Sequence, residues 1–230
     1  DPMGRIHWKV SARTGELFVK QTVPSSVIGG TLVLDLHDDS YVPEKKEERM
    51  ELAITTAASI AYLLQMSGEQ VGLITYAADA AEVAQYDVGV TQTLSRYDAE
   101  DSVPGESEST RLSPLCVPTR RSPIQAVQIA ENLARVLPGR ALDASQLIMN
   151  EFRGLPRDAA LLPVVPQMSE TLALTLAEMK LSGFAVTVFL ISAPSHYMDA
   201  ASMLAMHNIN LIHIEHERQL HEISPARIGH

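Results

Sequence analysis

Polar and charged side chains gather at the end of one short apolar run. The run Thr31–Leu36 (TLVLDL) contains Asp35, and His37, Asp38, Asp39 and Ser40 follow it. Hard cations such as Mg²⁺ prefer oxygen ligands, so the three carboxylates form a candidate cation site. The structural alternative is that the Asp35 carboxylate caps the loop at the end of the sheet and binds no ligand. A general acid/base pair would also require a pocket and a raised pKa, which a sequence does not display.

Histidines form a second candidate near the end of the chain. His213, His216 and His221 lie close to Glu215 and Glu217. On a strand, His213 and Glu215 would share one face and His216 would lie on the other. The spacing also differs from H-E-x-x-H. These residues therefore indicate a solvated segment rather than a zinc site.

Ser192 and His196 are a weak candidate for nucleophilic catalysis. Ser192 follows an apolar run, but Ala193 and Pro194 separate it from His196, and no G-x-S-x-G turn occurs. No glycine-rich loop has the spacing that cradles phosphates. The sequence thus favours neither a serine hydrolase nor a nucleotide-binding enzyme.

The elements that must position these residues alternate between strands and helices. Apolar runs predict strands at 31–36, 71–77, 80–86, 159–165, 184–192 and 209–214. Helical spacing and capping residues predict helices at 45–66, 123–137 (with Ser122 as N-cap), 143–152, 170–181 and 197–207. This alternation predicts an α/β fold with a doubly wound, mainly parallel sheet flanked by helices. Ligands bind such sheets at the carboxyl ends of strands, here the loops beginning at Asp35, Ala77, Val165 and Ser192.

The chain divides into three parts. Residues 1–30 form an N-terminal extended segment that we expect to pack on the domain. Residues 31–218 form the α/β domain, with a long surface insertion at about 92–122, and residues 219–230 form a polar tail. In the first part, Arg5, Trp8 and Arg13 are expected to be structural, with Trp8 packed and the arginines paired with acids. The alternative is a basic docking surface for an acidic partner or anionic lipid.

Composition narrows the class of function. The chain has 230 residues and a formal net charge of −10, which argues against a nucleic-acid partner. Its single cysteine, Cys116, excludes an intrachain disulfide and fits a reducing, cytoplasmic location. No apolar run reaches the roughly 18 to 20 residues that span a bilayer. Because the chain begins Asp-Pro without Met, we expect a fragment whose full-length protein is membrane-anchored only through an upstream region.

The N-terminal segment resembles a bacterial family. Residues 1–20 (DPMGRIHWKVSARTGELFVK) are similar to a motif of the "domain of unknown function 58" proteins, and the run at 31–36 follows where that family begins a von Willebrand factor A (vWA)-like domain. The resemblance implies a vWA-like, Rossmann-like fold and genes often near MoxR-type AAA+ ATPases. It also implies transmembrane helices upstream in many members.

Domains of the vWA type often hold Mg²⁺ in a metal-ion-dependent adhesion site. That site uses Asp-x-Ser-x-Ser after the first strand, a Thr from a second loop and an Asp from a third. Here the positions correspond to Asp35, His37 and Asp39, with Ser122 in place of the Thr. The third loop, residues 166–169, has no carboxylate. We expect a degenerate site, with Asp35, Asp39 and Ser122 as its remaining metal ligands, and no cofactor.

The leading hypothesis is a non-enzymatic protein-interaction module, working with a MoxR-type AAA+ ATPase in assembly or chaperone-like tasks. Its partner surface would comprise Asp35, His37, Asp38, Asp39, Ser40 and Ser122. The alternative is a metal-dependent hydrolase that uses Asp35, Asp38 and Asp39. A third hypothesis is a purely structural role in a membrane-anchored assembly.

Overall fold

The computed structural model describes residues 29–76, 78–79, 114–139 and 142–224. A six-stranded sheet has the order β4-β2-β1-β6-β7-β8. Its strands are β1 (Gly29–Leu34), β2 (Gln70–Tyr76), β4 (Pro114–Arg120), β6 (Ala160–Val165), β7 (Thr187–Leu190) and β8 (Asn210–His213). β4 runs antiparallel to β2 and the other neighbours pair in parallel. A separate pair joins β3 (Ala78–Asp79) to β5 (Val136–Leu137).

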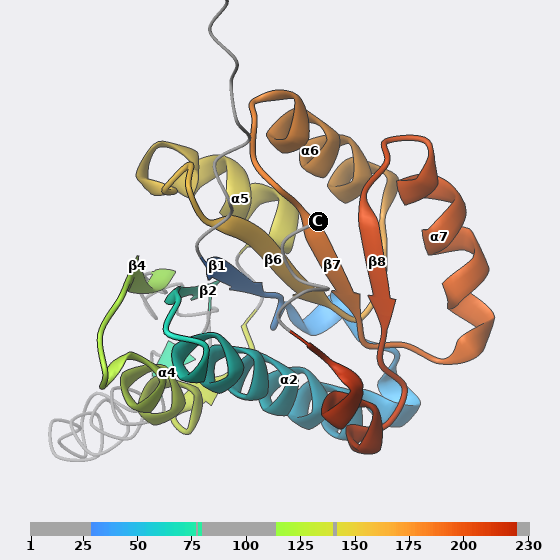
Figure 1. Ribbon diagram of the computed structural model, residues 1–230. Helices are drawn as coiled ribbons and strands as arrows, with labels where there is room; N and C mark the ends of the chain where they lie inside the picture. The colour runs from blue at the N-terminus through green and yellow to red at the C-terminus, as the bar shows by residue number, and fades with distance from the viewer. Residues whose placement is uncertain (1–28, 77, 80–113, 140–141, 225–230) are drawn as a thin grey trace, which may run out of the picture.

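Helices cover both faces of the sheet (Figure 1). One face packs against α2 (Lys46–Met66) and α4 (Gln125–Leu133), and the other against α5 (Ala144–Glu151), α6 (Glu170–Leu181) and α7 (Tyr197–Ala205). Successive residues of β1 serve opposite faces: Leu32 and Leu34 join the first core and Val33 joins the second. Burial on both faces explains why the parallel strands are continuous apolar runs rather than alternating ones. The predicted α/β class is confirmed.

The strand order reverses between β1 and β6, which both pair in the middle of the sheet. Counted along the chain, the six strands have the spatial order 3-2-1-4-5-6 of doubly wound folds. Loops leaving β1 and β6 at their carboxyl ends turn toward opposite faces at such a point and leave a crevice. The fold therefore places the loops after Leu34 and Val165 at the position where this class of sheet binds ligands.

Most predicted elements are confirmed. The helix predicted at 170–181 is α6, the helix at 45–66 is α2 preceded by a short 3₁₀ turn at Pro43–Lys45, and those at 143–152 and 197–207 contain α5 and α7. Asp143 accepts a hydrogen bond from the Gln146 amide, and the Gln146 side chain accepts one from the Asp143 amide, so a capping box starts α5. Five of the predicted strands correspond to β1, β2, β6, β7 and β8. The strand predicted at 80–86 lies outside the described residues.

The prediction of a surface loop at 92–122 is wrong for its last part. Pro114–Arg120 forms β4, an edge strand with Pro114 and Pro118. Proline lacks the amide hydrogen that a central strand requires, which favoured a loop, but an edge strand tolerates it. At Gly72 the backbones of β2 and β4 approach so closely that a Cβ would lie 2.2 Å from Thr119 Oγ1. Residues 92–113 lie outside the described residues.

Two further boundaries differ from the predictions. The helix predicted at 123–137 is shorter: its N-cap is Ile124 rather than Ser122, and its predicted end forms β5. The predicted polar tail begins inside a 3₁₀ helix, Glu217–Glu222. Leu220 and Ile223 of this segment pack against the core beside α2, which explains why an outwardly polar stretch is ordered. Among the described residues, no helix is both long and apolar enough to cross a membrane.

Candidate functional site

Asp35 lies at the carboxyl end of β1, buried in the loop that leaves the strand. Asp35 is only 5% exposed, and its Oδ1 accepts a hydrogen bond from the His37 amide at 2.9 Å. Its carbonyl accepts a hydrogen bond from the buried Tyr41 hydroxyl at 2.6 Å. Burial raises the pKa of Asp35 to about 6, and the charge of Asp143 adds to the rise, while hydrogen bonds from His37 and Ser40 oppose it. A carboxylate held this way belongs to the loop's own structure.

The rest of the loop forms a short turn after Asp35, and the Ser40 side chain hydrogen-bonds the Asp35 carboxylate. Asp38–Ser40 forms a 3₁₀ turn in which His37 Nδ1 accepts a hydrogen bond from the Asp39 amide at 3.3 Å. The Asp38 carboxylate pairs with Lys46 Nζ at 2.5 Å. Asp39 is exposed at the turn. The Asp38 amide also donates to the Gly139 carbonyl, which ties this loop to the segment that precedes α5.

Asp143 is the acidic neighbour of Asp35 that sequence reasoning missed as a site residue. Burial would raise its pKa, but hydrogen bonds from Ser145 Oγ at 2.5 Å and from the Gln146 amide lower it below its ordinary value. Its role as a helix cap was readable from the sequence. Its approach to Asp35 was not, since 108 positions along the chain separate them.

A cavity of about 210 Å³ brings these loops together. It is lined by the residues Asp35, His37, Asp39, Ser40, Asp143, Ala144, Ser145, Gln167, Ser169 and Leu172. Ser169 caps α6, with its hydroxyl accepting from the Leu172 amide at 3.1 Å. The third loop thus contributes an amide and a hydroxyl, and no carboxylate.

Ser122 is not part of this site. β4 is antiparallel to β2, with Arg120 opposite Val71 and Leu115 opposite Thr75, while Thr75 lies opposite Leu34. Ser122 therefore follows β4 at the far end of the sheet from Asp35, about 13 Å or more away given the rise per strand residue. The predicted combination of Ser122 with Asp35 is contradicted.

The remaining donors do not fit a magnesium site. Among the described residues, no group of three or more His, Cys, Asp or Glu side chains is placed to hold a metal ion. Asp35 bonds its own loop, Asp38 pairs with Lys46, and Asp143 caps α5. An octahedral ion requires several oxygens aimed at one point. The Asp35, Asp38 and Asp39 carboxylates of the hydrolase hypothesis do not converge in this way.

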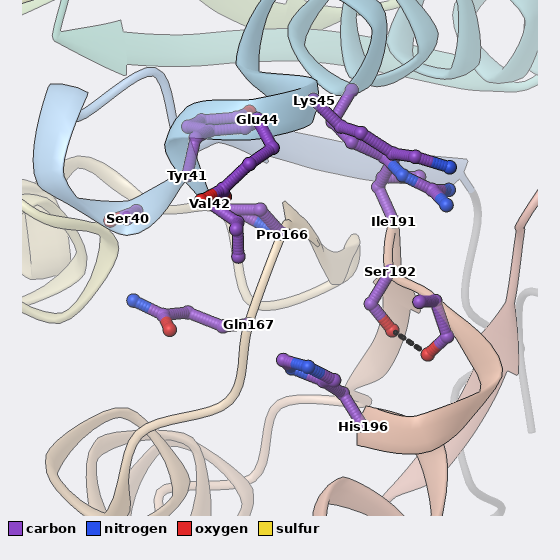
Figure 2. A pocket seen from close by; sticks show the side chains of 12 residues that line it. Ser40, Tyr41, Val42, Glu44, Lys45, Pro166, Gln167, Ile191, Ser192 and His196 are labelled. Atoms are coloured by element: carbon purple, nitrogen blue, oxygen red, sulfur yellow. Dashed lines mark hydrogen bonds between the residues drawn. The ribbon is translucent and has the colours of Figure 1, made fainter.

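A second cavity, of about 260 Å³, lies beside the first, toward β7 (Figure 2). Ser40 and Gln167 border both cavities. The Ser192 hydroxyl at its edge donates to the Ala193 carbonyl at 3.2 Å rather than to His196. In the described residues this serine lacks the base contact that a nucleophile needs. Ser192 and His196 therefore stay a weak candidate for nucleophilic catalysis.

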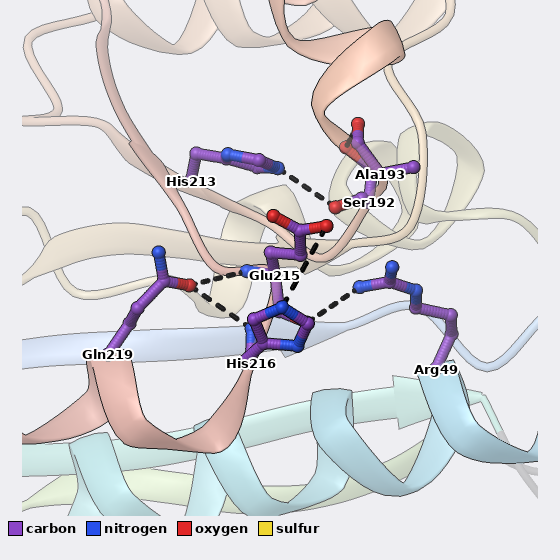
Figure 3. Close-up of polar contacts among 7 residues, drawn as sticks. All are labelled: Arg49, Ser192, Ala193, His213, Glu215, His216 and Gln219. Atoms are coloured by element: carbon purple, nitrogen blue, oxygen red, sulfur yellow. Dashed lines mark hydrogen bonds and ion pairs between the residues drawn. The ribbon is translucent and has the colours of Figure 1, made fainter.

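His213, at the end of the last strand, and His216, which follows it, make separate contacts (Figure 3). His213 Nε2 lies 2.8 Å from the Ser192 carbonyl, and its ring lies 5.3 Å from that of Tyr197. His216 is largely exposed and its Nε2 lies 3.9 Å from Glu215. The Gln219 side chain accepts hydrogen bonds from the amides of Glu215 and His216. These contacts are structural.

Arg5, Trp8 and Arg13, the structural motif residues predicted in the N-terminal segment, lie outside the described residues.

Comparison with protein families adds one result. Residues 1–94 match the family model described as "Protein of unknown function DUF58". The match spans the N-terminal motif, β1, α2 and β2, and so includes the loop that carries Asp35. It supports the resemblance stated from residues 1–20. No curated protein matches the chain.

Proposed function

We propose that this chain is a vWA-like protein-interaction module that binds its partner at the carboxyl edge of the sheet, without catalysis and without a bridging metal. The partner surface comprises Asp35, His37, Asp38, Asp39 and Ser40, next to the loops after β6 and β7. A MoxR-type AAA+ ATPase is the partner that the family resemblance favours. The observation that supports this proposal is that the loops after β1 and β6 meet where the strand order reverses, and that residues of both loops line a cavity there.

A surface of this kind suits binding better than catalysis. Asp39 is exposed and His37 half-buried, so both are available to a partner, whereas the buried Asp35 supports the loop from beneath. No donor set in the described residues converges on a metal, and the contacts of Asp38 and Asp143 are with their own neighbours. Loops on a rigid sheet are the usual place for recognition residues.

A matched pair of charge reversals tests the proposal. Asp39→Arg changes an exposed residue of the proposed surface, and Glu131→Arg changes an exposed residue of α4 on a helix-covered face. The chain would be mixed with a MoxR-type ATPase from the same organism and binding measured by biolayer interferometry. We expect Asp39→Arg to weaken binding by about tenfold or more and Glu131→Arg to leave it within about twofold.

Two results would overturn the proposal. One is that the wild-type chain binds no such ATPase and cross-linking in cells captures no specific protein partner. The other is that both variants weaken binding equally, which would place the contact elsewhere. Thermal unfolding of both variants controls for loss of fold.

A further inference from the structure

The second cavity combines positive charge with apolar walls. Its charged lining residues are Glu44 and Lys45, from the turn that precedes α2, and Arg49, from the first turn of α2. Tyr41, Val42, Pro166, Ile191 and Ala193 supply its apolar walls. The chain as a whole has a formal net charge of −10, whereas two basic side chains and one acidic side chain line this cavity. Its local charge is therefore positive, opposite to that of the whole chain. Figure 2 shows Lys45 and Ile191 on one side of the cavity and Gln167 and His196 on another.

Arg49 is the most informative of these residues. It is 9% exposed, and arginine is rarely buried so far without an acidic partner. Its Nη1 donates to the Glu215 carbonyl at 2.9 Å (Figure 3). No carboxylate of the described residues forms an ion pair with it. A guanidinium has several N–H donors in a planar fork that matches a carboxylate, so this contact leaves capacity for an anion.

The size of the cavity limits what it can hold. About 260 Å³ is smaller than the roughly 300 to 1,000 Å³ of pockets that take whole small-molecule ligands. A group with an apolar body and an anionic head fits the combination of walls and cations. The last residue of a polypeptide carries both on one Cα, since its side chain and its terminal carboxylate leave the same atom. Capture of a terminal carboxylate is an established mode of peptide recognition.

We propose that the cavity between the start of α2 and the end of β7 binds the free carboxyl terminus of a partner polypeptide whose last residue is apolar. Arg49 and Lys45 hold the carboxylate, and the wall formed by Val42, Pro166 and Ile191 receives the side chain. The Gln167 amide also lines the cavity and can bond the peptide backbone. This inference rests on the proposed function, because it names the chemistry of the partner that reaches the same edge of the sheet.

A short peptide tests the site without knowledge of the partner. The probe is a fluorescein-labelled hexapeptide ending in leucine, prepared as the free acid and as the C-terminal amide. Fluorescence anisotropy with the 230-residue chain reports binding. We expect the free acid to bind and the amide to bind at least about tenfold more weakly, because amidation removes the charged hydrogen bonds.

Three variants locate the binding. Lys45→Met and Arg49→Met remove the proposed cations, and Arg121→Met removes an exposed cation beyond β4, at the opposite end of the sheet. We expect a loss of about tenfold for Arg49→Met, a smaller loss for Lys45→Met, and no change beyond about twofold for Arg121→Met. Thermal unfolding shows whether Arg49→Met folds. If Arg49→Met does not fold, Lys45→Met still tests the site, because Lys45 is exposed and its replacement leaves the core unchanged.

The same assay contains the refuting results. Equal binding of the acid and the amide, or wild-type binding by Lys45→Met, would overturn the proposal. Hexanoate that binds as tightly as the peptide would assign the cavity to a free organic acid instead. Binding only to vesicles of phosphatidylcholine and phosphatidylserine in equal parts would assign it to a membrane. Each of these leaves the Asp39→Arg experiment unaffected, so failure here and failure of the interaction module are distinguishable.

Discussion

The burial of Asp35 predicts a specific dependence of stability on pH. The pKa of this carboxyl rises from its ordinary value of 3.8 to about 6 in the folded chain. At about 1.36 kcal/mol for each pKa unit, ionised Asp35 lowers the free energy of unfolding by about 3 kcal/mol relative to its protonated form. The buried site is 5% exposed, so solvent screening reduces this value little.

The sign follows from proton binding. Between about pH 4 and about pH 6 the native chain holds a proton on Asp35 that the unfolded chain releases. The free energy of unfolding therefore falls as the pH rises through this window, and the loss is complete above it. Asp35→Asn removes the titration, while the amide oxygen can still accept the hydrogen bond from the His37 amide.

Urea denaturation of the wild type and Asp35→Asn would measure the effect at about pH 4 and about pH 7.5. We expect the variant's free energy of unfolding, relative to the wild type, to increase by about 2.5 kcal/mol between the two conditions, because part of the total of about 3 kcal/mol is already lost at pH 4. Asp39→Asn, which changes an exposed carboxylate of the same loop, is the control and should show a much smaller change. A difference between Asp35→Asn and wild type that stays constant with pH would refute the reasoning.

Two further predictions concern packing and capping. Gly72→Ala should destabilise the chain by about 1 to 3 kcal/mol, because the added methyl would lie 2.2 Å from Thr119 Oγ1, whereas Gly154→Ala, with nothing within 4 Å of its Cβ, should stay within about 0.5 kcal/mol. Equal thermal-unfolding midpoints for the two variants would contradict the close approach of β2 and β4. Ser169→Ala should cost about 1 kcal/mol in urea denaturation, since it removes the hydroxyl that accepts from the Leu172 amide, and Ser169→Asp, which keeps an acceptor, should recover most of it.

Local patterns in the sequence were enough to predict the class of fold and most of its elements. The apolar runs at Thr31–Leu36 and Ala159–Val165 predicted β1 and β6, and the helical spacing after Lys45 predicted α2. The helix predicted at 143–152 contains α5, and its first residue is the one that caps α5. These features depend on a few neighbouring residues, which is why a single chain read in order reveals them.

The composition of the site depended on the tertiary structure. Ser122 was expected beside Asp35, but the antiparallel pairing of β4 with β2 carries it to the other end of the sheet. Asp143 and Gln167 reach the Asp35 cavity from distant segments, and Arg49 reaches the neighbouring cavity. Strand order, strand direction and register decide which loops meet, and they arise from burying apolar surfaces of segments far apart in the chain. The sequence by itself determined that a loop with Asp35 would end a strand, and only the packed sheet decided what surrounds it.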